Sequence, residues 1–214
     1  METGFWHDRW ARREIAWHES AAHPLLVEYF SRLKLATGSR VFVPLCGKTI
    51  DIAWLLANGY RVAGAELSEI AITELFQELG VQPVITRLGK LAHYGAHDID
   101  IFVGDIFDLT AATLGQVDAI YDRAALVALP RTMREQYSQH LRNLTRTAPQ
   151  LLITFEYDQQ LMDGPPFAIV KAEVKQHYAA AYHLTAEVHR QLPGGLKGKV
   201  PATETVWLLQ PAKK

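Results

Sequence analysis

The sequence lacks the features that mark secreted, membrane-spanning and nucleic-acid-binding proteins. It has one cysteine, Cys46, which excludes an intrachain disulfide and fits a reducing compartment. No apolar run is long enough to span a bilayer, and the first residues show no apolar signal-peptide core. A net charge of −1 and a pI of about 6.8 do not favour nucleic acid or anionic membranes. We therefore expect a cytoplasmic monomer whose partners are small molecules, with neither nucleic acid nor a membrane among them.

The length and composition are typical of one compact domain. The 214 residues and the apolar fraction of 49% are enough for a full hydrophobic core. There is no internal repeat, low-complexity tract or linker. We predict a single domain over residues 1–214, with residues 1–30 as an aromatic N-terminal extension.

Predicted strands and helices alternate along the chain. Apolar runs and turn signals predict strands at 41–45, 61–65, 83–88, 99–104, 117–121, 151–157, 182–189 and 203–209. Helices are predicted at 49–58, from Ser68 to Gly80, from Pro130, and at 168–180. This order predicts an α/β fold with a mostly parallel sheet. The last two strands have no helix between them and should form an antiparallel C-terminal pair.

The segment 41–51 carries the strongest functional signal. An apolar strand runs into a tight turn at Cys46, Gly47 and Lys48, and the turn opens a helix whose first N–H groups can meet a ligand. About twenty residues later the next strand ends in Glu66, where a carboxylate can accept hydrogen bonds from ribose hydroxyls. These two features indicate a nucleoside-type cofactor. The turn lacks the G-x-G-x-x-G pattern, so a dinucleotide is less favoured.

Four residues stand at predicted strand ends: Leu45, Glu66, Asp105 and Arg123. In open α/β sheets, ligands bind at the carboxyl ends of the strands. We therefore expect these four residues to cluster around one ligand site, although they are far apart in the sequence.

Several short stretches, in order along nearly the whole chain, resemble the thiopurine S-methyltransferase family of bacterial type. The matching stretches are 6–10 (Trp-His-Asp-Arg-Trp), 44–48 (Pro-Leu-Cys-Gly-Lys), 64–69 (Gly-Ala-Glu-Leu-Ser-Glu), 105–109 (Asp-Ile-Phe-Asp-Leu), 122–128 (Asp-Arg-Ala-Ala-Leu-Val-Ala) and 164–167 (Gly-Pro-Pro-Phe). The resemblance implies a Rossmann-like class I methyltransferase fold. It also implies S-adenosyl-L-methionine as the methyl donor and a small thiol or selenol as the acceptor, such as an aromatic or heterocyclic thiol of the thiopurine kind.

The resemblance also implies roles for particular residues. The cofactor contacts it suggests are Trp10, Leu45, Glu66, Asp105, Ile106 and Arg123, with Asp105 and Ile106 at the adenine ring. Gly47 serves the turn and, without a Cβ, also lets the cofactor approach closely. On the acceptor side it suggests Trp17 and Arg123, with Arg123 as the one catalytic residue, and no metal is expected. Phe167, which follows Pro165 and Pro166, is expected to close the wall of the acceptor pocket. The chain departs from the family pattern at Ala124, where glycine is expected, and its loop 192–200 resembles the bacterial members.

Other readings compete with these roles. Trp6, Trp10 and Trp17 are three of the five tryptophans. They could form the inner face of a helix or a lid over the cofactor and a flat acceptor, and the resemblance favours the lid. Arg123 could form an internal ion pair with the adjacent Asp122, or it could stabilise an acceptor thiolate, which we favour.

Two apparent reactive groups are given no chemistry. Cys46 is interpreted as a small buried residue, because direct methyl transfer requires no covalent enzyme intermediate. His93 and His97, four residues apart, are interpreted as a solvated pair, because no third metal ligand is near them in sequence.

Two alternatives to thiol methylation stay open at this point. One is a methyltransferase for selenium, tellurium or halide acceptors, which would share the fold and the cofactor motifs. The other is a protein of a different class, either a non-catalytic cofactor-binding module or an NAD-dependent oxidoreductase. The absent G-x-G-x-x-G pattern counts against NAD.

Overall fold

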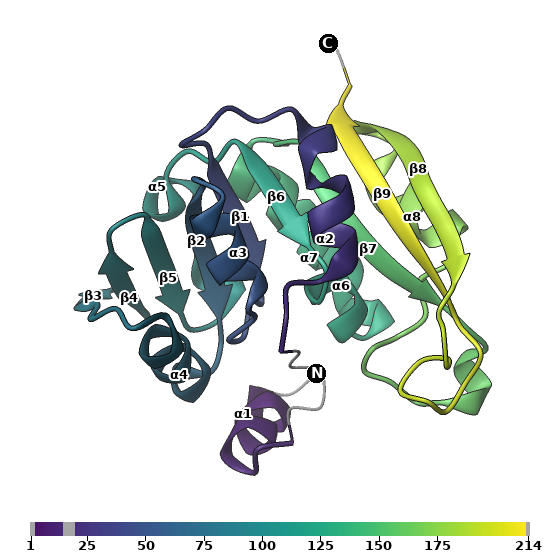
Figure 1. The fold of residues 1–214 in the computed structure, drawn as a ribbon, viewed down its shortest axis with the longest axis horizontal. Helices are drawn as coiled ribbons and strands as arrows, with labels where there is room; N and C mark the ends of the chain where they lie inside the picture. Colours follow the sequence, from purple (N-terminus) through teal and green to yellow (C-terminus); the bar gives the residue numbers. More distant parts are fainter. Residues whose placement is uncertain (1–2, 15–19, 213–214) are drawn as a thin grey trace.

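A nine-stranded mixed sheet runs through the centre of the molecule (Figure 1), and the strand order is β3-β4-β5-β2-β1-β6-β7-β9-β8. The computed structural model describes residues 3–14 and 20–212. The strands are β1 (Arg40–Pro44), β2 (Arg61–Glu66), β3 (Val84–Leu88), β4 (Leu91–Ala96), β5 (Ile99–Val103), β6 (Ala119–Asp122), β7 (Gln150–Glu156), β8 (Tyr182–Gln191) and β9 (Thr203–Pro211). Strands β5, β2, β1, β6 and β7 are parallel, and the remaining pairings are antiparallel. The predicted antiparallel C-terminal pair is therefore confirmed.

Helices cover both faces of the sheet. They are α1 (Thr3–Ala11), α2 (Pro24–Tyr29), α3 (Asp51–Ala57), α4 (Glu69–Leu79), α5 (Ala111–Leu114), α6 (Ala125–Ala128), α7 (Arg131–Thr145) and α8 (Lys171–Tyr178), with 3-10 turns at Phe30–Leu33, Ile106–Asp108 and Gln159–Leu161. In Figure 1, α2, α3 and α4 lie in front of the sheet, and α7 and α8 lie behind it. None of the helices within residues 3–14 and 20–212 has the length and apolar character that crossing a membrane requires.

The central strands are buried because both of their faces meet helices. All five residues of β1 are buried, and alternate residues point to opposite faces. Phe42 joins the core that contains Tyr137 of α7, while Val41 joins the core that contains Ile52 of α3 and Leu75 of α4. A continuous apolar run in the sequence thus becomes a strand buried on both sides.

The end signals of α4 act as the sequence predicts. The Ser68 hydroxyl accepts a hydrogen bond from the Ala71 N–H at 3.3 Å, and Gly80 ends the helix in the left-handed region with φ 66°. The predicted helix at 168–180 instead begins at Lys171. Residues before it stay irregular because the Phe167 and Ile169 N–H groups donate to the Val127 and Phe155 carbonyls.

Strand β4 was not expected, and it changes the interpretation of two histidines. His93 lies in β4 and contacts Asp100 of β5, with Nε2 to Oδ1 at 2.8 Å. His97 lies beyond the strand with its side chain 94% exposed, beside Asp98. The predicted solvated pair is therefore wrong. Within the described part of the chain, no three His, Cys, Asp or Glu side chains are grouped as a metal would require.

Candidate functional site

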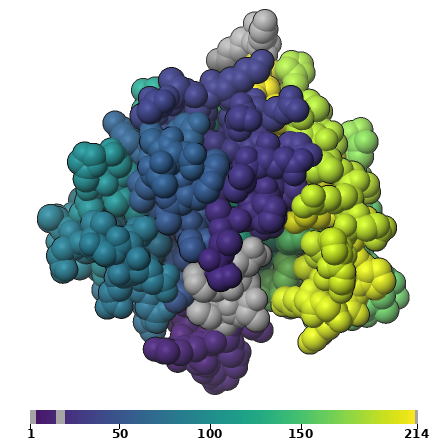
Figure 2. Space-filling model, viewed as in Figure 1, coloured from purple at the N-terminus to yellow at the C-terminus, as the bar shows by residue number. Residues whose placement is uncertain are grey.

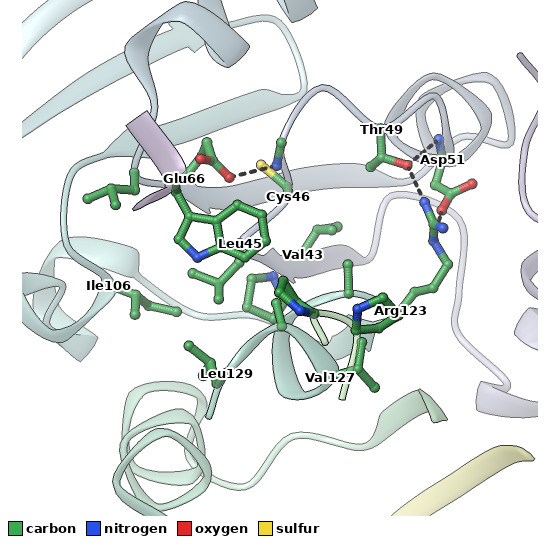
Figure 3. A pocket seen from close by; sticks show the side chains of 18 of the residues that line it. Val43, Leu45, Cys46, Thr49, Asp51, Glu66, Ile106, Arg123, Val127 and Leu129 are labelled. Atoms are coloured by element: carbon green, nitrogen blue, oxygen red, sulfur yellow. Dashed lines mark hydrogen bonds and ion pairs between the residues drawn. The ribbon is translucent and has the colours of Figure 1, made fainter. Parts of the chain in front are cut away.

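A cavity of about 440 Å³ lies at the carboxyl ends of β1, β2, β5 and β6. Leu45, Glu66, Asp105 and Arg123 all line it, so the structure brings together the four residues at the predicted strand ends. The volume is in the range of small-molecule sites. Figure 3 shows Glu66 and Arg123 on different sides of this cavity, with Leu45 between them.

The turn between β1 and α3 forms the floor of the cavity. Leu45 has φ 46° and Gly47 has φ 53°, so two residues of this turn are left-handed, one of them against the preference of a branched side chain. The Cys46 N–H donates to the Ala65 carbonyl at 3.0 Å, which ties the turn to β2. A Cβ on Gly47 would lie 3.1 Å from the Trp10 ring, so glycine permits the close approach of the indole.

Glu66 is held in place by backbone donors. Its side chain accepts from the Gly47 N–H at 2.8 Å and from the Ser68 N–H at 2.9 Å, one on each carboxylate oxygen. Burial raises the pKa of Glu66, and these N–H groups oppose the rise. The carboxylate therefore lies in a fixed orientation at the cavity wall, where its remaining lone pairs can accept from a ligand.

Apolar and aromatic groups surround the same end of the cavity. Trp10 is buried and lines the cavity together with Trp6 of the same helix. Asp105 and Ile106 follow β5, the neighbour of β2 in the sheet. Ile106 is buried, and the Asp105 carboxylate accepts from the Phe107 N–H at 2.9 Å. Helix α1 lies at the lower edge of the face in Figure 2, and both of its tryptophans line the cavity. This arrangement suits a flat ring system beside a polar group.

Arg123 forms an ion pair with Asp51, not with the adjacent Asp122, which was the less favoured interpretation of its role. The Arg123 Nε lies 3.2 Å from the Asp51 Oδ2, and its Nη2 donates to the Thr49 hydroxyl at 3.3 Å. Figure 3 shows both contacts. Arg123 still lines the cavity, as the favoured interpretation requires.

Asp122 has a structural role behind the cavity. Its carboxylate accepts from the Ala125 and Leu126 N–H groups at 3.0 and 3.2 Å and from the Tyr137 hydroxyl at 2.8 Å. Burial raises the pKa of Asp122 to about 6. Asp122 thereby holds the start of α6, whose Val127 and Ala128 form part of the cavity wall.

Four polar residues at the Arg123 end were not expected: His23, Asp51, Tyr121 and Glu204. The His23 N–H donates to Asp51 at 2.7 Å, and the His23 Nε2 lies 3.5 Å from Glu204. Burial lowers the pKa of His23 to about 4, with a further contribution from the charge of Arg123. Asp51 and Tyr121 stand next to the recognised motifs and could have been suspected. Glu204 lies in β9, far from any of the recognised motifs, and no sequence pattern indicated it.

Two predicted site residues, Trp17 and Phe167, are not among the described residues at the cavity wall. Trp17 lies outside the described residues. Phe167 is not among the residues that line the cavity, because its ring lies against Arg134, with the guanidinium carbon 5.3 Å from the ring centroid. Pro165 and Pro166 form the wall that was predicted for Phe167. Cys46 is buried, and burial raises the pKa of its thiol well above the usual value, which disfavours the thiolate.

The loop at 192–200 closes the cavity on the C-terminal side. Leu192, Leu196 and Lys197 line the cavity, and the Lys197 ammonium donates to the Pro165 carbonyl at 2.7 Å. A small core of Tyr157, Leu196, Val200 and Ala202 supports the loop.

Solved structures of S-adenosylmethionine-dependent methyltransferases share this fold. One is from Anabaena variabilis, with a TM-score of 0.68 and 16% identity over 97% of this chain and 95% of that one. Another is the 1,6-didemethyltoxoflavin-N1-methyltransferase of Burkholderia thailandensis with bound S-adenosylhomocysteine, with a TM-score of 0.67 and 16% identity over 97% of this chain and 87% of that one. The fold is thus the predicted Rossmann-like fold of this class of methyltransferases.

The sequence identifies the family within this class. Residues 1–200 match the sequence profile described as Thiopurine S-methyltransferase (TPMT). A thiopurine S-methyltransferase of Xanthobacter autotrophicus is 57% identical over 99% of this chain and 100% of that protein, and one of Teredinibacter turnerae is 49% identical over 98% and 97%. The chain belongs to the thiopurine S-methyltransferase family. It is an S-adenosylmethionine-dependent methyltransferase.

Proposed function

We propose that this enzyme methylates the sulfur of a small aromatic or heteroaromatic thiol, such as a thiopurine. One observation carries the proposal: a fixed carboxylate, Glu66, and a cation, Arg123, line the same cavity from different sides. The family match supports the thiol acceptor and gives no support to selenium, tellurium or halide acceptors.

The residues at the Glu66 end fit S-adenosylmethionine. The buried carboxylate would accept from the two ribose hydroxyls, and Asp105 and Ile106 would hold the adenine ring. Trp10 and Leu45 would contact the rest of the cofactor. When bound, S-adenosylmethionine supplies an electrophilic methyl group on a sulfonium. An aromatic face at Trp10 favours a cation of this kind.

The Arg123 end fits a flat acceptor. Its walls are mostly apolar side chains, among them Val127, Leu129, Met133 and Phe155. A guanidinium beside a thiol lowers the pKa of that thiol and favours the thiolate, which is already a good nucleophile. The enzyme therefore needs no dedicated general base. Alignment of acceptor and methyl donor in one closed cavity can supply roughly 7–11 kcal/mol of the rate enhancement.

Three further properties belong to the same proposal. Helix α1 acts as a lid on the single domain, since Trp6 and Trp10 both line the cavity. The enzyme acts as a monomer, since residues of one chain surround the cavity. The cytoplasm is the fitting compartment, because a reducing environment keeps the acceptor thiol available.

An acceptor panel with labelled S-adenosylmethionine tests the proposal. We expect methyl transfer to thiopurines and thiophenols, and a thermal shift with S-adenosylhomocysteine but none with NADH. Glu66→Ala serves as the control that binds cofactor weakly. Transfer to selenite, tellurite or halide with no transfer to any thiol would overturn the proposed acceptor. Light scattering of the active protein gives its molecular mass and so tests whether it is a monomer.

A further inference from the structure

Asp51 is a buried carboxylate in the cavity wall with no role in the proposed chemistry so far. It is the first residue of α3, and its side chain is 1% exposed. Its Oδ1 accepts from the His23 N–H at 2.7 Å. Its Oδ2 accepts from the Tyr121 hydroxyl at 3.0 Å and lies 3.2 Å from the Arg123 Nε. Backbone, hydroxyl and guanidinium groups from two segments, the residue before α2 and the end of β6, thus meet on one side chain.

The charges around Asp51 make Arg123 its main partner. A buried carboxylate is stable only when it is paired and hydrogen-bonded, and the Arg123 side chain is itself only 16% exposed. His23 carries no charge near neutral pH, because burial lowers its pKa to about 4. Glu204 of the same wall has its own cation, with Arg190 Nη2 at 3.5 Å. Asp51 and Arg123 therefore balance each other's charge.

The position of Asp51 links the two halves of the cavity. It follows the turn that contains Leu45 and Gly47, and its own N–H donates to the Thr49 hydroxyl at 3.3 Å. That hydroxyl also accepts from the Arg123 Nη2. The guanidinium is thus attached at two points to the segment that forms the cofactor half of the site.

We propose that Asp51 is a positioning residue that holds the Arg123 guanidinium at the acceptor sulfur. Asp51 acts through Arg123 and does not touch the acceptor. This inference rests on the proposed function, since it assigns Arg123 to the acceptor. It explains why an arginine on a short loop after β6 has a defined orientation.

The variant Asp51→Asn tests the role with little change in shape. The amide oxygen still accepts from the His23 N–H, but the amide nitrogen presents N–H groups to Arg123 and Tyr121, which are donors themselves. We expect kcat/KM for a thiol to fall at least about tenfold, while the affinity for S-adenosylhomocysteine changes less than about twofold. Asp51→Glu keeps the charge but moves it by one methylene, so we expect a loss of about threefold.

Asp100→Asn is the matched control. Asp100 forms an ion pair with Arg40 at 2.9 Å, near the other end of the parallel strands, and neither residue lines the cavity. We expect this variant to lose stability and to keep the kcat/KM of the wild type. Circular dichroism and S-adenosylhomocysteine binding report whether each variant is folded.

A double-mutant cycle shows whether Asp51 acts through Arg123. In the Arg123→Ala background, Asp51→Asn should change kcat/KM less than about twofold, because the group it positions is gone. An equal loss in both backgrounds would overturn the inference. So would Asp51→Asn with wild-type kinetics or, if that variant does not fold, Asp51→Glu with wild-type kinetics.

The pH–rate profile separates positioning from a loss of structure. For a weakly acidic thiol, the midpoint pH of the rate should move upward in Arg123→Ala, because the cation is gone. Positioning predicts an upward move in Asp51→Asn as well, because the displaced guanidinium no longer lies at the sulfur, whereas loss of the carboxylate charge alone would move the midpoint downward. The midpoint should stay in place in Asp100→Asn. His23, Tyr121 and Glu204 face the same cluster and are unchanged in all three variants. A uniform rate loss with an unmoved midpoint would contradict positioning. A wild-type enzyme that methylates no thiol would instead overturn the proposed function itself.

Discussion

Gly47 donates its backbone N–H to the Glu66 carboxylate at 2.8 Å, and this bond joins the β1–α3 turn to the end of β2. The other carboxylate oxygen accepts from Ser68, which caps α4. One side chain thus ties together the two loops that surround the cofactor half of the cavity. Glu66 has a structural function in addition to its proposed contact with ribose, and the two functions can be separated by mutation.

We predict that Glu66→Ala weakens S-adenosylhomocysteine binding at least about tenfold, since each hydrogen bond to a charged group contributes about 1.5–3 kcal/mol. The variant also leaves the Gly47 and Ser68 N–H groups without their acceptor, so the free energy of unfolding should fall by about 1–3 kcal/mol. Calorimetry measures the affinity for S-adenosylhomocysteine, and urea denaturation measures the free energy of unfolding.

Glu66→Gln separates the two functions. The amide keeps one oxygen for a backbone N–H but loses the charge that faces the ribose. We expect a smaller loss of stability than in Glu66→Ala and a comparable loss of affinity. A folded Glu66→Ala protein that binds S-adenosylhomocysteine with wild-type affinity would show that Glu66 does not contact the cofactor.

We predict that Gly47→Ala weakens cofactor binding through strain and steric contact. Gly47 has φ 53°, where a Cβ costs about 1 kcal/mol or more, and the new methyl group would lie 3.1 Å from the Trp10 ring. The indole must move away from the turn. Gly80→Ala is the control, because its φ is 66° and nothing lies near the added Cβ. Both variants should lose stability, and only Gly47→Ala should lose affinity for S-adenosylhomocysteine.

Local signals were enough to predict the central fold and the position of Glu66 at the cavity. Ser68 and Gly80 fixed the ends of α4 because capping depends on residues close in sequence. Glu66 could be placed on the cavity because the end of a parallel strand fixes where its next side chains lie. Each of these predictions needs only one element and its neighbours.

Which side chains contact Arg123, Phe167 and His93 depends on segments that are distant in sequence. Arg123 is adjacent to Asp122 in sequence, yet it pairs with Asp51, because Asp122 is committed to the N–H groups of α6. Phe167 follows two prolines that line the cavity, but its ring lies against Arg134 of another helix. Strand β4 (Leu91–Ala96) has no continuous apolar run, and His93 faces Asp100 only once β5 is beside it. No local pattern contains this information.

We predict that His23 makes the protein less stable in acid. Burial lowers the pKa of His23 from its ordinary value of 6.5 to about 4, so the unfolded chain binds a proton more readily than the folded one between these values. Stability should therefore fall as the pH drops from about 6.5 towards 4, by on the order of 2 kcal/mol. His23→Gln lacks this titration. The free energy of unfolding of both proteins, measured from pH 4 to 7, gives the difference.

Asp122 acts in the opposite sense over part of the same range. Its pKa is raised from 3.8 to about 6, so it contributes stability at low pH that is lost as the pH rises through 6. Both proteins contain Asp122, and its effect cancels in the difference between them. Parallel stability curves for wild type and His23→Gln would show that His23 titrates normally in the folded protein.

We predict that Lys197 holds the loop 192–200 against the rigid segment at Pro165. Its ammonium donates to the Pro165 carbonyl at 2.7 Å, and both residues line the cavity on the acceptor side. Lys197→Met keeps the aliphatic stem but loses the donor, and a net contribution of about 1 kcal/mol corresponds to a rise of about fivefold in the acceptor KM. The affinity for S-adenosylhomocysteine should not change, because Glu66 lies elsewhere on the cavity wall. Lys199→Met is the matched control, since Lys199 is exposed and does not line the cavity. Equal acceptor KM values in the two variants would show that the loop is held by its small apolar core alone.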